Sequence, residues 1–323
     1  MPQRRADLPL IRRFPALATV PRAALGTFPT AVERVQTPSG TLLLKRDDLS
    51  AERVGGNKVR GLEFLLGGLA PGERVLTVGP LGSTHALATA VHAGALGARV
   101  TVVRWPQEMH DAARQVDARI RAEAEVLDAW NVTFAYLAAF ALRARSGARW
   151  IPAGGATPLA VLGHVNAALE LVEQILAGEC VEPDVILVPL GTGGTAAGLA
   201  LGLRIAGLAT RVRPVRVVPR IVGRAARVAS LANSGARLIE RLTRERLPRL
   251  RPSDVAVEHA FFGGGYGRPL QPRPPGEDAL AASGVRLDDT YSRKAFAAAA
   301  ASAGKRPMLW LTFDGRLLQD SPL

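Results

Sequence analysis

The chain has 323 residues, 48% of them hydrophobic, and a formal net charge of +13. Its length exceeds one typical core, which predicts two domains. The single cysteine, Cys180, excludes an intrachain disulfide and favours a reducing compartment. With no apolar run that resembles a signal peptide or a membrane span, we expect a cytoplasmic protein without membrane association.

The first recognisable unit alternates strand and helix. Residues 74–79 form an apolar strand, a Gly-rich turn follows, 84–97 has helical character and 98–105 is the next strand. This order predicts a β-α-β unit with parallel strands. An Ala- and Arg-rich helix is then expected over 111–130.

A second series continues the alternation. It has helix 159–178, strand 184–191, helix 196–207 and strands 211–219, 255–261 and 307–313. Such a pattern is typical of an α/β fold with helices on both faces of mostly parallel sheets.

The strongest local motif is a glycine-rich loop between a strand and a helix. It comprises Gly191, Thr192, Gly193, Gly194 and Thr195. Glycines let successive N–H groups point at one anion, and the helix N-terminus adds partial positive charge, so the motif predicts a phosphate site. The loop has no Walker A lysine and no acidic residue after the next strand. Arg220 leaves NADP open, and a turn used only for packing is the structural alternative.

Lys58 is the second signal, in a chain where only four of 41 basic residues are lysine. It follows Gly-Gly-Asn57 and opens an apolar helical stretch. The positive end of a helix dipole and burial both lower an ammonium pKa, and a neutral amine can form a Schiff base. The alternative is an exposed helix lysine paired with Glu63 or Asp47.

Together, the GGNK segment and the downstream glycine loop resemble fold-type II pyridoxal-phosphate enzymes, whose fold is like that of tryptophan synthase β. The chain is more specifically similar to the family of 1-aminocyclopropane-1-carboxylate deaminase and D-cysteine desulfhydrase. The similarity runs from about Leu42 to Phe313. The stretches that carry it are KRDDLS, GGNKVRGLEFLL, VGPLGSTHALATAVHAGALG, IPAGGATPLAVLGHVNAALEL, VPLGTGGTAAGL, GGGYGRP and LDDTYSRKAF.

The resemblance implies a role for each matched residue. Lys58 would hold pyridoxal 5′-phosphate and move the substrate's Cα proton, and Ser83 would contact the substrate carboxylate. Tyr266 and Tyr291 match two active-site tyrosines, for which packing of a turn or of the core is the alternative. The remaining implied cofactor residues are Asn57, Thr84, Gly191, Thr192, Gly193, Gly194, Thr195, Ser292 and Thr312.

The chain departs from the family pattern at several of these positions. Thr84 replaces an asparagine, Ser292 stands where deaminases carry glutamate, and Asp289 replaces a proline. At 311–315 only Thr312 of the usual His-Thr-Gly-Gly is kept in register. A hydroxyl at the pyridine nitrogen supports the electron sink less than a carboxylate, which favours α,β-elimination over ring opening.

We therefore expect a pyridoxal-phosphate-dependent lyase or deaminase acting on a small amino acid, most like D-cysteine desulfhydrase, that releases a keto acid and ammonia. A cofactor-binding homologue with weak, altered or no activity is the alternative. Two three-layer α/β domains are expected, a large one from 1–59 and 159–323 and a small one from 60–158. A homodimer is implied by the resemblance. We expect neither a metal site nor nucleic-acid binding, although the arginine surplus leaves the latter open.

Overall fold

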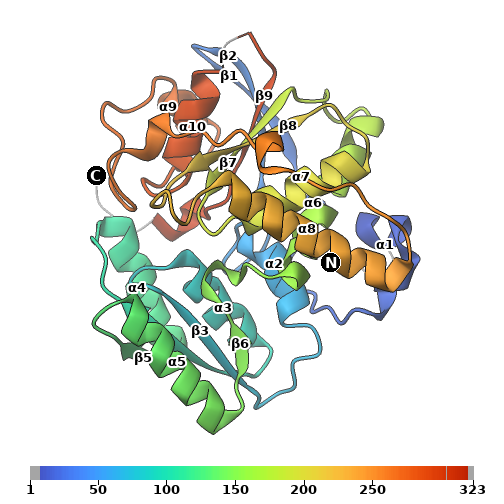
Figure 1. Ribbon diagram of the computed structural model, residues 1–323. Coiled ribbons are helices and arrows are strands. Elements are labelled where there is room, and N and C mark those ends of the chain that lie inside the picture. The colour runs from blue at the N-terminus through green and yellow to red at the C-terminus, as the bar shows by residue number, and fades with distance from the viewer. Residues whose placement is uncertain (1–7, 303, 319–323) are drawn as a thin grey trace.

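The computed structural model describes residues 8–302 and 304–318. Two sheets, each covered by helices, organise it (Figure 1). The strands are β1 (Val32–Thr37), β2 (Gly40–Lys45), β3 (Arg74–Pro80), β4 (Arg99–Trp105), β5 (Glu125–Asp128), β6 (Arg149–Ile151), β7 (Val185–Leu190), β8 (Arg211–Arg216) and β9 (Pro307–Trp310). The helices are α1 (Pro9–Arg13), α2 (Lys58–Leu65), α3 (Thr84–Ala95), α4 (Asp111–Glu123), α5 (Val132–Ser146), α6 (Pro158–Leu176), α7 (Gly194–Ile205), α8 (Ala225–Thr243), α9 (Glu277–Ala282) and α10 (Ser292–Ala300).

The smaller sheet has four parallel strands in the order β5-β4-β3-β6. Side chains alternate along β3, so Val75 packs with α2, α3 and α4 while Leu76 and Val78 pack against α5. This gives three layers, with α5 alone on one face.

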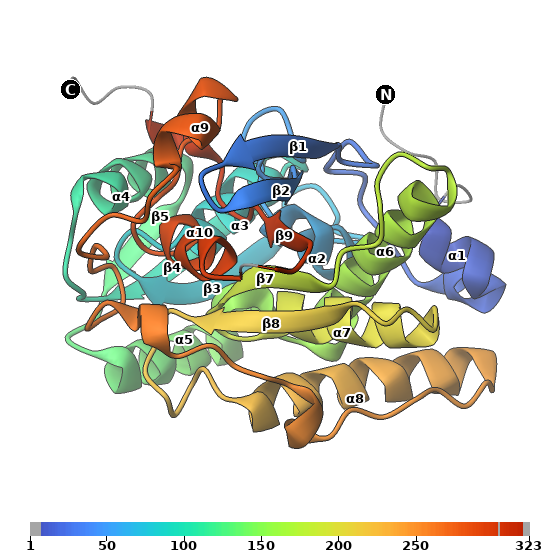
Figure 2. The same ribbon diagram turned by 90° about the horizontal axis from the view of Figure 1, so that it is seen from above.

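The larger sheet has the order β1-β2-β9-β7-β8, which Figure 2 shows from β1 to β8. Among its described strands, only the pair β1–β2 is antiparallel. Ile186 and Val188 of β7 face the core shared with α6, α7 and α8, whereas Val185 and Leu187 face α9 and α10. The predicted α/β class with mostly parallel sheets is confirmed.

Side-chain caps explain where several helices begin. Ser83, Asn131 and Thr157 each accept a hydrogen bond from the backbone N–H three residues on, at the starts of α3, α5 and α6. Pro158 occupies the first position of α6, where its missing N–H costs nothing.

The strands expected over 211–219 and 307–313 are shorter, at Arg211–Arg216 and Pro307–Trp310, and two other predicted elements differ in kind. The helix expected over 111–130 ends at Glu123, because 125–128 instead pairs with β4 as a short edge strand. The strand expected over 255–261 makes only one bridge, between Glu258 and Val215, before a 3₁₀ turn. Neither change moves the predicted motifs.

The sheets suggest how the chain divides. Strands of the smaller sheet come from 74–151, and those of the larger sheet come from 32–45 and from residues after 184. On this basis we propose two domains, a small one formed by residues 60–158 and a large one formed by residues 1–59 together with 159–323.

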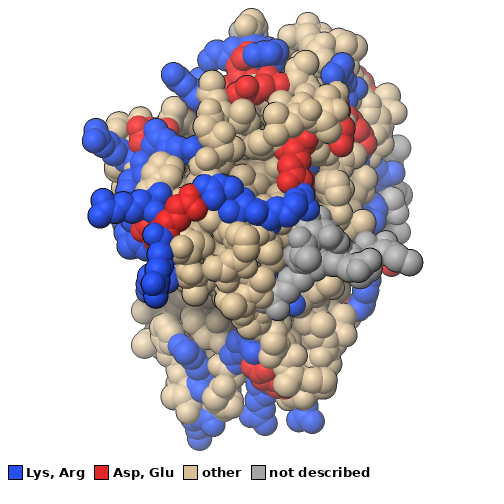
Figure 3. Space-filling view, turned by 90° about the vertical axis from the view of Figure 1, so that its right-hand side faces the viewer, with Lys and Arg blue, Asp and Glu red and all other residues tan. Residues whose placement is uncertain are grey.

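Helix α6 is, among the described residues, the one helix whose length and hydropathy would suffice to cross a membrane. Of its most apolar stretch, 72% is buried inside the protein, as in a core helix. On the face shown in Figure 3, basic side chains are spread over the surface with acidic side chains beside several of them.

Candidate active site

Lys58 is the first residue of α2, and two glycines shape the loop before it. A Cβ on Gly55 would lie 2.2 Å from the Asp48 carbonyl oxygen, and Gly56 has a φ of +101° and lies against the Thr312 carbonyl. Burial lowers the pKa of the Lys58 amine to about 8. The loop therefore delivers a partly neutral amine to the positive end of a helix, as the sequence predicts.

The glycine loop 191–195 connects β7 to α7 and lines the same pocket as Lys58. Gly193 has a φ of +93°, which a side chain would disfavour. Thr192 fits closely against Gly154, where a Cβ would lie 2.3 Å from the threonine Oγ1. His85 and His164 also line this pocket. The lysine and the predicted phosphate cradle, 133 positions apart in the sequence from Lys58 to Gly191, thus line one pocket.

Asn57 and Thr195 join the two segments directly. The Asn57 Nδ2 donates a hydrogen bond of 2.6 Å to the Thr195 Oγ1. The Asn57 backbone N–H also points at the Thr312 carbonyl, 3.3 Å away. Thr312 therefore contacts the lysine loop through its backbone.

A second pocket contains Thr84, Tyr266 and Tyr291. The two tyrosine hydroxyls are hydrogen-bonded to each other, and their rings meet edge to face with centroids 5.8 Å apart. Burial raises the pKa of both, that of Tyr291 to about 12, although a hydrogen bond with Thr84 acts in the opposite direction. Both phenols are therefore proton donors at neutral pH.

Ser83 and Ser292 are each held by a local contact. The Ser83 Oγ accepts from the Ala86 N–H at 3.3 Å, which leaves its own proton available. The Ser292 hydroxyl donates to Asp288, whose carboxylate also accepts from the N–H groups of Thr290 and Tyr291. Ser83 and Ser292 lie outside the linings of the two pockets, although each neighbours a residue of the second one in sequence.

A buried ionic network stands behind Lys58. Arg60 donates to both oxygens of Asp47 and of Glu170, and Lys45 reaches Glu170 at 2.6 Å. The Trp310 indole N–H completes the set by donating to Asp47 at 2.7 Å. These contacts fix α2 to α6 and β9, and hence fix the position of the lysine.

Sequence reasoning missed several residues that shape this region. Asp314, 2% exposed, accepts from the Gly55 N–H at 2.9 Å, so the segment that departs from the family pattern supports the lysine loop. Arg227 of α8 donates to the Thr192 carbonyl at 2.8 Å. His164 is a polar residue inside the apolar α6, and that contrast was a signal available in the sequence. Asp288 carried no signal in the sequence except its position three residues before Tyr291.

Comparisons with known proteins agree with this geometry. Residues 23–306 match the family described as pyridoxal-phosphate dependent enzyme. Nocardicin C-9′ epimerase of Nocardia uniformis subsp. tsuyamanensis is 36% identical over 301 residues, covering 87% of this chain and 88% of its own. D-cysteine desulfhydrase of Salmonella choleraesuis is 31% identical over 298 residues, with 87% and 88% covered. A solved structure described as an ACC deaminase homologue superimposes with a TM-score of 0.74 at 26% identity, covering 96% of this chain and 98% of its own.

The family match spans most of the chain, and it names the cofactor that the paired lysine and glycine loop predict. This protein belongs to the family of pyridoxal-phosphate-dependent enzymes, and its cofactor is pyridoxal 5′-phosphate.

Proposed function

We propose that this enzyme removes the α-proton of a small amino acid and then eliminates its β-substituent, in the manner of D-cysteine desulfhydrase. One observation carries the proposal. The Lys58 amine, with its pKa lowered to about 8, shares a pocket with the glycine loop 191–195. An amine and an anion cradle in the lining of one pocket suit a ligand with an aldehyde and a phosphate.

The residues present fit the cofactor. Gly193 and Gly194 expose backbone N–H groups at the start of α7, and a side chain at Gly193 would be strained. The buried His164 Nδ1 has no hydrogen-bond partner among the described residues, which suits a group that binds a polar ligand. Among residues 8–302 and 304–318, no group of three or more potential metal ligands occurs. We propose Asn57, Thr84, Ser292 and Thr312 as further contacts to the ring, as the family resemblance implies.

Different side chains of this protein would carry out the separate proton transfers. When bound, the cofactor supplies an electron sink for the charge left at Cα. Lys58 Nζ, neutral above pH 8, accepts the α-proton. Ser83, whose oxygen already accepts from Ala86, offers its proton to the substrate carboxylate. Tyr266 and Tyr291, both protonated, serve as acid for a leaving thiolate rather than as base.

The contact between Ser292 and Asp288 changes the effect that we expect Ser292 to have on the cofactor ring. Because the Ser292 proton is donated to Asp288, the serine oxygen can only accept a hydrogen bond from any other group. Placed at a pyridine nitrogen, it would favour the protonated ring. The buried carboxylate would thus act through the hydroxyl, which supports elimination without a glutamate at this position.

Epimerisation is a second candidate, because one relative at 36% identity is named nocardicin C-9′ epimerase. Both reactions begin with removal of the same α-proton. They diverge when a proton returns to the opposite face or when a leaving group departs.

The first test is an absorption spectrum. Wild type and Lys305→Ala, an exposed control, should show a visible band that Lys58→Ala loses. A colourless wild type that ignores added pyridoxal phosphate would overturn the proposal. With D-cysteine we expect sulfide, ammonia and a keto acid. Exchange of the α-proton with deuterium, without ammonia, would instead support epimerisation. Neither reaction with a panel of D- and L-amino acids would identify a cofactor-binding homologue without turnover.

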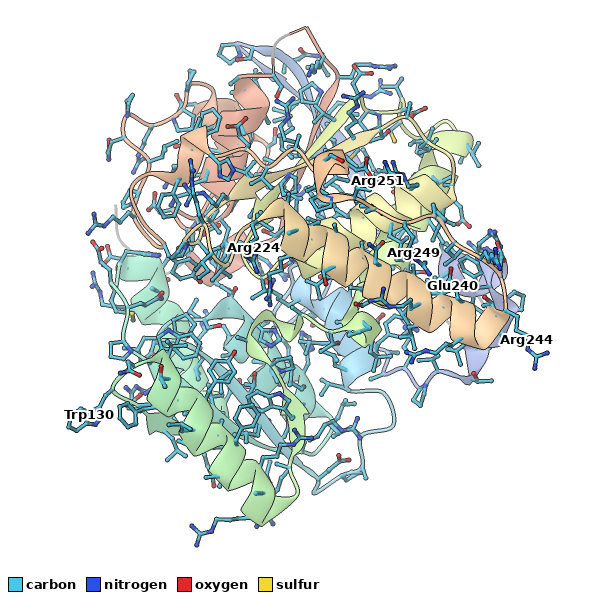
Figure 4. The ribbon with its side chains drawn as sticks, viewed as in Figure 1. Trp130, Arg224, Glu240, Arg244, Arg249 and Arg251 are labelled. Atoms are coloured by element: carbon cyan, nitrogen blue, oxygen red, sulfur yellow. The ribbon has the colours of Figure 1, made fainter. Side chains whose placement is uncertain are left out.

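We also propose a homodimer. The region around α5 exposes Trp130, Phe134, Leu137 and Phe140, with Trp130 89% exposed and projecting outward in Figure 4. These side chains present on the order of 500 Å² of apolar surface, a large part of the roughly 800 Å² that a stable interface buries on each partner. A second copy with the same face, its α5 antiparallel, would cover them.

Light scattering tests this proposal. Wild type should have twice the chain mass, and Leu137→Glu should have the mass of one chain. Leu176→Glu, at an exposed leucine on α6, is the control and should remain dimeric. A monomeric wild type, or a dimer unchanged by Leu137→Glu, would reject α5 as the interface.

A further inference from the structure

His164 is a buried titratable group without an assigned role. Its side chain is 5% exposed and lines the pocket of Lys58 and the glycine loop. Within the part of the chain that the structure describes, its Nδ1 has no hydrogen-bond partner, and its Nε2 lies 3.5 Å from the Thr195 Oγ1. Buried polar atoms are rarely left unpaired, so an unpaired nitrogen on a side chain that lines a pocket points to a polar ligand.

The backbone leaves His164 little freedom to turn away. On one side of α6, a Cβ on Gly163 would lie 1.9 Å from the Arg60 carbonyl oxygen of α2. On the adjacent face of α6, a Cβ on Gly198 of α7 would lie 2.3 Å from the His164 Cβ. Helix α6 thus packs closely against both α2 and α7, which meet it near the centre of the molecule (Figure 1). The imidazole is held beside the first turn of α7.

The charges around His164 keep it neutral while no anion is present. Burial and the cations Lys58 and Arg60 of α2 lower its pKa well below the usual histidine range. His85 of α3 lines the same pocket, and burial lowers its pKa to about 3. Helix α7 carries no charged residue before Arg204, and α8 packs on α6 through Gly235. Glu170 lies on α6 itself, but its oxygens are taken by Lys45 and Arg60.

A phosphate in the glycine loop would change this balance. It brings negative charge to the end of the pocket where Thr195 and His164 meet. A nearby anion favours the imidazolium form, and a charged donor makes the stronger hydrogen bond to phosphate.

We propose that His164 is a phosphate ligand in addition to the loop, and that it takes up one proton from solvent when the phosphate binds. This inference rests on the proposed function, because the phosphate is that of the cofactor. It adds a side-chain contact to a cradle otherwise made of backbone and threonine hydroxyls.

The test compares pyridoxal phosphate with pyridoxal, which lacks the phosphate, on protein freed of cofactor. His164→Gln and His164→Phe should weaken binding of pyridoxal phosphate roughly tenfold to a hundredfold, the range of a hydrogen bond to a charged group, and leave pyridoxal binding unchanged. His92→Gln is the matched control. His92 is also a buried histidine, but its Nε2 bonds to the Val54 carbonyl at 2.8 Å.

A second measurement needs no variant. In ¹⁵N-histidine-labelled wild type, pyridoxal phosphate but not pyridoxal should shift one imidazole to the doubly protonated form. If no histidine responds, or if the His164 variants weaken both ligands equally, the inference is wrong while the proposed function stands. If wild type binds neither ligand, both fail.

Discussion

Among the residues of the buried ionic network beside Lys58, Glu170 is the one whose removal should most reduce the stability of the protein. Its oxygens accept from Lys45 and Arg60 at 2.6–2.9 Å, and the neighbouring cations lower its pKa from 4.5 to about 2 despite burial. A carboxyl with a lowered folded-state pKa stabilises the fold above its unfolded pKa, here 4.5, and loses that contribution as the pH falls towards 2. The shift corresponds to about 3 kcal/mol at neutral pH.

Glu170→Gln keeps the shape but leaves two buried cations with only Asp47 as counter-ion. We expect the free energy of unfolding to fall by about 3–5 kcal/mol at pH 7, the usual cost of breaking a buried ion pair. The difference from wild type should shrink as the pH falls from 4.5 to 2. Urea denaturation, followed by both circular dichroism and tryptophan fluorescence, measures it.

Glu173→Gln is the matched control, because Glu173 lies on the same helix and pairs with Arg12 with both side chains nearly half exposed. Its cost should be below about 1 kcal/mol. A loss for Glu170→Gln no larger than that of Glu173→Gln would refute the assignment of the network as an anchor.

Three further predictions follow from the site. Gly163→Ala should destabilise the protein by about 1–3 kcal/mol through overpacking against Arg60. Gly94→Ala, at an open helical position, is the control and should stabilise it by about 0.5–1 kcal/mol. Equal effects of the two substitutions in thermal melts would contradict the close contact at Gly163. Asn57→Ala removes the hydrogen bond to Thr195 and should weaken cofactor binding about tenfold in equilibrium titrations, and an unchanged affinity would exclude a supporting role. The rate of cofactor attachment to Lys58 should rise with pH and level off above about 8, since burial lowers the pKa of the amine; stopped-flow absorbance that climbs on to about pH 10 would indicate an ordinary lysine.

The sequence contained most of the fold around the site. The apolar stretch 184–190 predicts strand β7. The glycines that follow it predict the loop, and the helical periodicity after them predicts α7. The lysine could be singled out because lysine is rare in this chain. These are local signals, and the structure confirms the elements that they predict.

Long-range pairing could not be predicted in the same way. The edge strand β5 has only four residues, and its strand character comes from hydrogen bonds to β4 rather than from its own pattern. The unpaired Nδ1 of His164 depends on which helices pack against α6. Likewise, Asp288 takes its importance from the turn that brings Ser292 back to it.

The glycine contacts at 163 and 198 set more than the packing of α6. Because the backbones of α2 and α7 both pack directly on α6 at these contacts, the two glycines leave no room for a side chain between the helices. The distance between the Lys58 amine and the anion cradle is therefore set by the packing of backbone on backbone. We therefore expect the packing of the core, before any substrate arrives, to favour a ligand whose rigid ring matches that distance.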